Sequence, residues 1–169
     1  MSEIVILKKE KMDGSITAFD IEPPFPLPER TKFGVDPGTV NMGLAILHTK
    51  SAQLFKIKMV RADKALDRML EVQRVLTLCI RWFGKSPLAI IEGAAFMKSN
   101  YRQVEIAEVR ASMALWFHKY KVEVEIVPPN TIRKQVFGHG RTKNPWSNLQ
   151  DDLAASLGCA YYDSSKTSN

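Results

Sequence analysis

Two acidic residues stand where an acid is unusual, each at the end of a short apolar segment. Asp36 follows residues 33–35, and Glu92 follows the wholly apolar residues 88–91. A carboxylate at the end of a buried strand is costly unless it is paired or binds a cation. Asp36 could instead cap the turn that follows it, and Glu92 could pair with a buried arginine. If the two strands are neighbours, both carboxylates meet at one place and suit a hard divalent cation such as Mg²⁺.

A third acid comes from the helix predicted near the C-terminus. At about 100° per residue, Leu153, Leu157 and Ala160 fall within about 80° of Leu149 and form the buried stripe. Asp152 flanks this stripe and is the better candidate for a carboxylate that faces a sheet. Asp151 points toward water, where the helix dipole favours an acid in the first turn.

Basic residues gather in residues 129–146, which contain no acid. This composition is typical of a phosphate-binding patch, and a solvated basic loop is the alternative. His139, between two glycines, could contact phosphate or carry a proton, or could simply be exposed. The candidate nucleic-acid contacts of this segment are Arg133, Lys134, His139, Arg141 and Lys143.

A second mixture of aromatic and basic side chains follows Glu92. Such a mixture suits stacking on bases and contact with phosphates. The candidates are Phe96, Lys98, Tyr101 and Arg102. Phe96 could equally pack in the core. The helix predicted over residues 104–120 carries more apolar surface than one buried face needs, so we expect it to form a dimer contact.

Composition narrows the class of protein. A chain of 169 residues with 45% hydrophobic and 25% charged residues fits one globular domain. Nineteen of the 24 basic residues but only twelve of the 18 acidic ones follow residue 32, so nucleic acid is the leading partner. Two cysteines without metal-type spacing exclude a zinc or disulfide framework. No apolar run could span a membrane and no signal peptide opens the chain, so we expect a cytoplasmic protein with no membrane contact.

The elements that must position these residues follow from periodicity. Strands are predicted over residues 3–7 and 15–19 as a hairpin, then over 32–36, 41–48, 51–60, 88–91 and 122–127. Helices are predicted over residues 62–83, 104–120, 131–137 and 147–162. The order from residue 32 is the connectivity of the ribonuclease H-like fold. We therefore expect an α/β protein with a mixed five-stranded sheet flanked by helices and an extra N-terminal β-hairpin. Its parts are a hairpin and Pro-rich connector (1–31), the nuclease domain (32–163) and a flexible tail (164–169).

Four segments of this chain resemble motifs of the RuvC-type Holliday junction resolvases. They are Phe33-Gly34-Val35-Asp36-Pro37-Gly38 with Asn41-Met42-Gly43, then Ala89-Ile90-Ile91-Glu92, the segment 127–143, and the helix 151–160. The resemblance covers residues 33–162 in order. The compact resolvases of phages and viruses are the nearest kind, although residues 1–32 have no counterpart in minimal members.

The resemblance implies a structure-selective endonuclease that resolves four-way DNA junctions. Its implied site holds two Mg²⁺ ions, with Mn²⁺ as a substitute, bound by Asp36, Glu92 and Asp152. Lys143 would neutralise charge in the transition state, and Phe96 would stack at the junction centre. A symmetric homodimer would cut two opposed strands of the two-fold symmetric junction.

One departure from the family pattern bears on activity. The last helix of the family usually carries two metal-binding positions spaced i and i+3, which here are Asp152 and Ala155. Alanine cannot bind a metal, so the chain is an inactivated variant, a natural degenerate member, or one that uses Asp151 in a shifted alignment. The helical wheel argues against the shift. We therefore expect strong junction binding with weak or no cleavage.

Three other functions remain as rivals at this point. A related nuclease of the same fold, such as the small YqgF-like proteins, would act on RNA. A non-catalytic protein would bind branched DNA without cutting it. Asp36-Pro37-Gly38-Thr39 also resembles the phosphate loop of a sugar kinase or actin-type ATPase, but such a protein needs a second domain of similar size, for which 169 residues leave no room.

Overall fold

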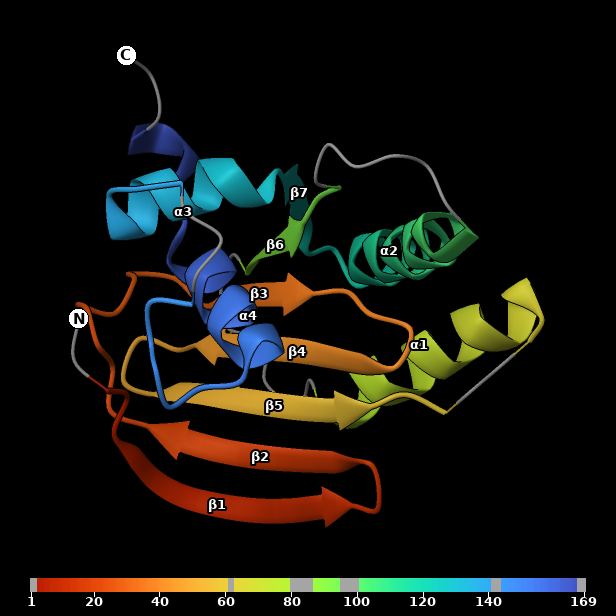
Figure 1. The fold of residues 1–169 in the computed structure, drawn as a ribbon, viewed down its shortest axis with the longest axis horizontal. Coiled ribbons are helices and arrows are strands. Elements are labelled where there is room, and N and C mark those ends of the chain that lie inside the picture. Colours follow the sequence, from red (N-terminus) through yellow and green to blue (C-terminus); the bar gives the residue numbers. More distant parts are fainter. Residues whose placement is uncertain (1–2, 61–62, 80–86, 95–100, 141–143, 167–169) are drawn as a thin grey trace.

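The computed structural model describes residues 3–60, 63–79, 87–94, 101–140 and 144–166. Its centre is a seven-stranded sheet of order β1-β2-β5-β4-β3-β6-β7 (Figure 1). The strands are β1 (Ile6–Asp13), β2 (Ile16–Ile21), β3 (Lys32–Asp36), β4 (Asn41–Leu47), β5 (Ala52–Lys58), β6 (Leu88–Glu92) and β7 (Glu123–Val127). The helices are α1 (Ala65–Cys79), α2 (Tyr101–Lys119), α3 (Pro129–Phe137), α4 (Asp151–Tyr161) and the 3-10 helix η1 (Ser164–Lys166).

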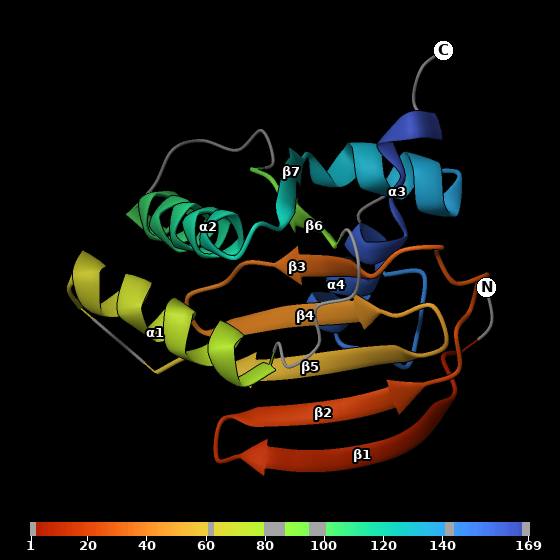
Figure 2. The ribbon, with the colours of Figure 1, turned by 180° about the vertical axis from the view of Figure 1, so that it is seen from behind.

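The predicted fold class is confirmed. Strands β3, β4 and β5 form an antiparallel meander, and β6 and β7 add in parallel on the other side of β3. Helices α1 and α2 cover one face of the sheet, and α4 lies on the other face (Figures 1 and 2). The β1–β2 hairpin pairs antiparallel with β5, so it continues the sheet outward. No helix in the described part of the chain is long and apolar enough to cross a membrane.

The hairpin and the start of the last helix depart from the predicted boundaries for identifiable reasons. The hairpin joins Ile6–Asp13 to Ile16–Ile21, whereas the sequence pattern predicts 3–7 with 15–19. The lysine-rich end of the first strand lacks apolar alternation, because β1 is an edge strand, where charged side chains are common. The last helix begins at Asp151 and not at residue 147. Asn144 accepts a hydrogen bond from the Trp146 backbone N–H and donates one to the Leu149 carbonyl, which holds the preceding residues in a loop.

The two layers of helices have separate cores. An ion pair holds α1 to α2, because the buried Arg68 guanidinium contacts Glu108 at 2.6 Å and Glu105 at 3.7 Å. Both cysteines are buried and free, as predicted. On the other face, Gly34 and Gly43 let α4 lie directly on the sheet. A side chain at either glycine would collide with the α4 backbone, at Ser156 and Ala160 for Gly34 and at Asp152 for Gly43.

Candidate active site

Strands β3 and β6 bring two of the candidate acids to one edge of the sheet. They are parallel neighbours, and Val35 pairs with Ile91. Asp36 and Glu92 are the next residues on each strand, so they continue the same row about 5 Å apart in backbone position. The two strands are therefore neighbours, which is the condition for their carboxylates to lie close together.

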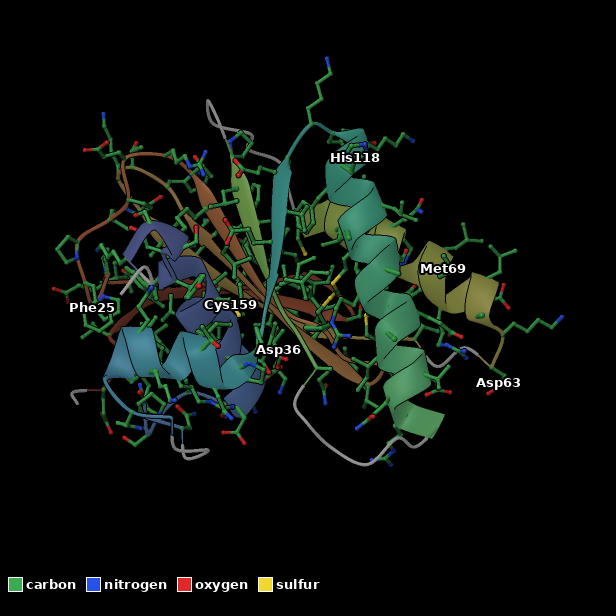
Figure 3. All side chains as sticks on the ribbon, turned by 90° about the horizontal axis from the view of Figure 1, so that it is seen from above. Phe25, Asp36, Asp63, Met69, His118 and Cys159 are labelled. Atoms are coloured by element: carbon green, nitrogen blue, oxygen red, sulfur yellow. The ribbon has the colours of Figure 1, made fainter. Side chains whose placement is uncertain are left out.

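Helix α4 adds the third acid from above the sheet. The backbone of Asp152 contacts Gly43, which pairs with Asp36 across β3 and β4. Asp151 is exposed, whereas one carboxylate oxygen of Asp152 is buried. The structure thus places Asp152, rather than Asp151, toward the sheet. Figure 3 shows Asp36 beside α3 and α4.

The burial of these acids and their proximity change the electrostatics of Asp36 and Glu92. Burial, with the nearby carboxylates of Glu92 and Asp152, raises the pKa of Asp36 to about 8. Burial also raises the pKa of Glu92, against the opposing charges of Arg133 and Arg110. Removing a carboxylate from water and placing it beside others disfavours its charged form. Such a group is stabilised as an anion by a cation.

The residues present fit a hard divalent cation. Atom Oδ2 of Asp152 is buried and has no hydrogen-bond partner, so this oxygen is available to bind a cation. Carboxylate oxygens are the ligands that Mg²⁺ prefers. Within the described residues, however, no three His, Cys, Asp or Glu side chains stand close enough to enclose an ion. The acids therefore supply charge and oxygen donors in an open arrangement.

Ala155, at the position where the family resemblance predicts a further ligand, faces a small pocket. Ala155 lines a pocket of about 120 Å³ together with Glu92 and the exposed Asp151. Arg133 of α3 lines the same pocket, and its charge lowers the pKa of both Asp36 and Glu92 relative to burial alone. The pocket leaves room for a longer side chain at position 155. Arg133, which we predicted as a DNA contact, stands directly beside the acids.

The other predicted DNA-binding residues divide into three groups. Lys134 and His139 are exposed near the end of α3, and Arg102 is exposed at the start of α2. Tyr101 begins α2, but its side chain is not among those described. Four residues lie outside the described part of the chain, namely Phe96, Lys98, Arg141 and Lys143.

Two contributions are not evident from the sequence. The Arg110 side chain donates a hydrogen bond from Nε to the backbone carbonyl of Glu92, at 3.1 Å. This hydrogen bond holds the end of β6 in place without using the Glu92 carboxylate. The only signal in the sequence is an arginine within an amphipathic helix. The second contribution comes from Gly34 and Gly43, which let α4 approach the sheet closely. Their positions in the first motif do not indicate this packing role.

The strand order, the parallel β3–β6 pair and the acids under a C-terminal helix define a ribonuclease H-like protein. A family model described as "Crossover junction endodeoxyribonuclease RuvC" matches residues 32–147. The chain belongs to this family, as the resemblance predicted.

Known relatives agree with this placement. The crossover junction endodeoxyribonuclease RuvC of Prochlorococcus marinus is 27% identical over 116 residues, which is 65% of this chain and 74% of that protein. A Thermus thermophilus RuvC structure aligns with a TM-score of 0.59 at 18% identity, over 77% of this chain and 90% of that chain. T. thermophilus RuvC in complex with a Holliday junction substrate aligns with a TM-score of 0.58 at 20% identity, over 78% and 90%. The structural matches establish the shared fold.

Proposed function

We propose that this chain binds four-way DNA junctions as a homodimer, in the cytoplasm, and belongs to the junction-cutting endonucleases that depend on Mg²⁺. The observation that carries the proposal is the convergence of Asp36, Glu92 and Asp152, with a buried and unpartnered Asp152 oxygen. Acids this close together repel one another unless a cation lies among them. The family relatives named above supply the DNA substrate class.

The three acids would hold Mg²⁺ through their carboxylate oxygens. When bound, Mg²⁺ supplies activation of a water molecule and stabilisation of the leaving oxygen of a phosphodiester. Arg133, the cation beside the acids, would orient the scissile phosphate and balance charge that develops on it. Lys143 is our predicted second cation for balancing this charge. The exposed Lys134 and His139 are our predicted phosphate contacts.

Ala155 would limit the reaction at the metal-binding step. It lies one turn along α4 from Asp152 and lines the pocket that also holds Glu92. An aspartate there would add a fourth carboxylate to the open arrangement. We therefore expect the chain to bind junctions firmly and to cut them weakly or not at all.

Helix α2 supports the proposed dimer. Exposed apolar side chains recur along it at helical spacing, at Val104, Ala107, Ala111 and Leu115. Val104 is 55% and Leu115 61% exposed. A stripe of this kind on a helix is a typical self-association surface. A symmetric pair would present two sites to a two-fold symmetric junction.

The decisive experiment compares the chain with its Ala155→Asp variant on an end-labelled four-way junction and on a linear duplex, with and without Mg²⁺. An Ala65→Asp variant is the matched control, since Ala65 is exposed at the start of α1. Paired symmetric nicks by Ala155→Asp alone are the expected result. Robust cutting by the unchanged chain would refute the role of Ala155.

Other outcomes separate the rival functions. Tight junction binding without cleavage by either protein would identify a non-catalytic branched-DNA-binding protein. Cleavage of a structured RNA, with no effect on the DNA junction, would identify an RNA-directed nuclease of the same fold.

A further inference from the structure

A basic groove lies on the sheet extension formed by β1, β2 and β5. Its volume is about 450 Å³, and it is bordered by the residues that lead into α4. Its lining contains four lysines and no carboxylate, namely Lys9, Lys11, Lys56 and Lys58. Ser15, Thr17 and Phe19 of the hairpin also line it. The two strands β1 and β2 precede residue 32, where the family match begins.

The groove lies on the same row of the sheet as the acidic site. Lys11 pairs with Thr17, and Thr17 with Lys56. Lys56 pairs in turn with Gly43, and Gly43 with Asp36. Residues paired across strands project to the same face. One row of paired residues therefore runs from Lys11 to Asp36, on the face that carries α4.

The lysines are available to bind an anion. Lys9, Lys11 and Lys58 are exposed and Lys56 is half-buried. None of the four forms an ion pair with another described side chain, and Lys9 lies over the Phe19 ring, 5.8 Å from its centre. The acids of the hairpin occupy other positions.

Those acids lie on the opposite face of the hairpin. Glu10 pairs with Lys8 at 3.7 Å, and Asp20 accepts a hydrogen bond from Gln53 at 2.9 Å. Glu10 and Asp20 alternate with the groove residues along their strands, which sends their side chains to the other side. The groove face thus carries four lysines and no described carboxylate, whereas Lys8, Glu10 and Asp20 share the opposite face.

We propose that this groove binds the phosphate backbone of a duplex arm of the DNA whose junction lies at the acidic site. The inference rests on the proposed function, because it takes the reacting phosphate to lie at Asp36. Strands are spaced about 4.8 Å apart, so Lys56 lies about 10 Å and Lys11 about 19 Å from the Asp36 row position. At about 3.4 Å per base pair, these lysines reach about three to six base pairs from the cut.

The position of the groove gives the hairpin a function. A duplex that leaves the acidic site past the start of α4, which covers this row at Gly43, would meet lysines of β5 and then lysines of β1. Contacts to phosphate carry no sequence information, so they would strengthen binding and fix the direction of the arm. The hairpin would thereby extend the DNA-binding surface beyond the part that matches the family.

The test compares three proteins for binding to four-way junctions at several salt concentrations. One is the unchanged chain, and one replaces Lys9, Lys11, Lys56 and Lys58 by glutamine. The matched control replaces four exposed lysines away from the groove with the same change in net charge: Lys50, Lys119, Lys121 and Lys166. Urea unfolding of each protein checks that the fold is intact.

We expect the groove variant to bind at least about tenfold more weakly and its slope of log affinity against log salt to be shallower by about 3. The control should keep the slope of the unchanged chain.

Two results would overturn the inference. If the groove variant and the control lose affinity equally, the effect is one of net charge and no groove contact exists, while the proposed function stands. If the unchanged chain itself does not prefer a junction to a linear duplex, the proposed function fails and the groove assignment fails with it.

Discussion

Replacing Asp36 by asparagine should stabilise the metal-free protein at neutral and higher pH. In the folded chain Asp36 keeps its proton until about pH 8, whereas an unfolded aspartate loses it near its usual pKa of 3.8. Between these values the folded state binds more protons than the unfolded state. The free energy of unfolding therefore falls as pH rises from about 4 to about 8.

The size of the effect follows from the pKa shift. One pKa unit corresponds to about 1.4 kcal/mol, so a shift from 3.8 to about 8 sets an upper limit near 6 kcal/mol. Asp36 keeps partial solvent exposure, and screening reduces the effect. We expect the unchanged chain to lose about 2 kcal/mol relative to Asp36→Asn between pH 5 and pH 8.

Urea unfolding in the presence of a chelator measures this difference. Asp67→Asn is the control, since Asp67 is exposed in the first turn of α1. Adding Mg²⁺ at pH 8 should stabilise the unchanged chain more than the Asp36→Asn variant, because an ion that binds only the folded state adds to stability. Parallel pH curves for Asp36→Asn and the unchanged chain would refute the reasoning that these acids destabilise one another.

Two further changes test the placement of the site and the proposed dimer. Gly43→Ala should lower the free energy of unfolding by about 2 kcal/mol, because the new side chain would collide with the α4 backbone at Asp152. Gly14→Ala is the control in urea unfolding, since open space surrounds Gly14. Equal stability of the two variants would contradict the close approach of α4 to the sheet. Leu115→Glu should convert the dimer into a monomer in sedimentation experiments and change the free energy of unfolding by less than about 0.5 kcal/mol. The control Leu66→Glu replaces a similarly exposed leucine on α1 and should remain dimeric. If Leu115→Glu also remains dimeric, this face of α2 is not the dimer interface.

The sequence alone predicted the fold class and the candidate acids. Apolar periodicity located the strands that end in Asp36 and Glu92, because the burial pattern of a strand follows from its own residues. The helical wheel separated Asp152 from Asp151 for the same reason, because the angle between residues on a helix is fixed. Four motifs in the right order then predicted the family, which the family comparison confirms.

The sequence did not predict the extent of the hairpin or the start of α4. Charged side chains on the edge strand β1 masked its period, and side-chain hydrogen bonds of Asn144 decided where α4 begins. The first depends on the place of β1 at the edge of the sheet, and the second on local side-chain hydrogen bonds that apolar periodicity does not register.

Only the tertiary structure decided how the functional residues stand toward one another. Parallel pairing of β3 with β6 placed Asp36 beside Glu92, and the bare backbone of Gly43 let α4 bring Asp152 onto the same edge. The shared row of the sheet joined Lys11 to that edge across four strand pairings. These relations arise from strand register and close packing between distant segments, and such contacts exist only once the chain has folded.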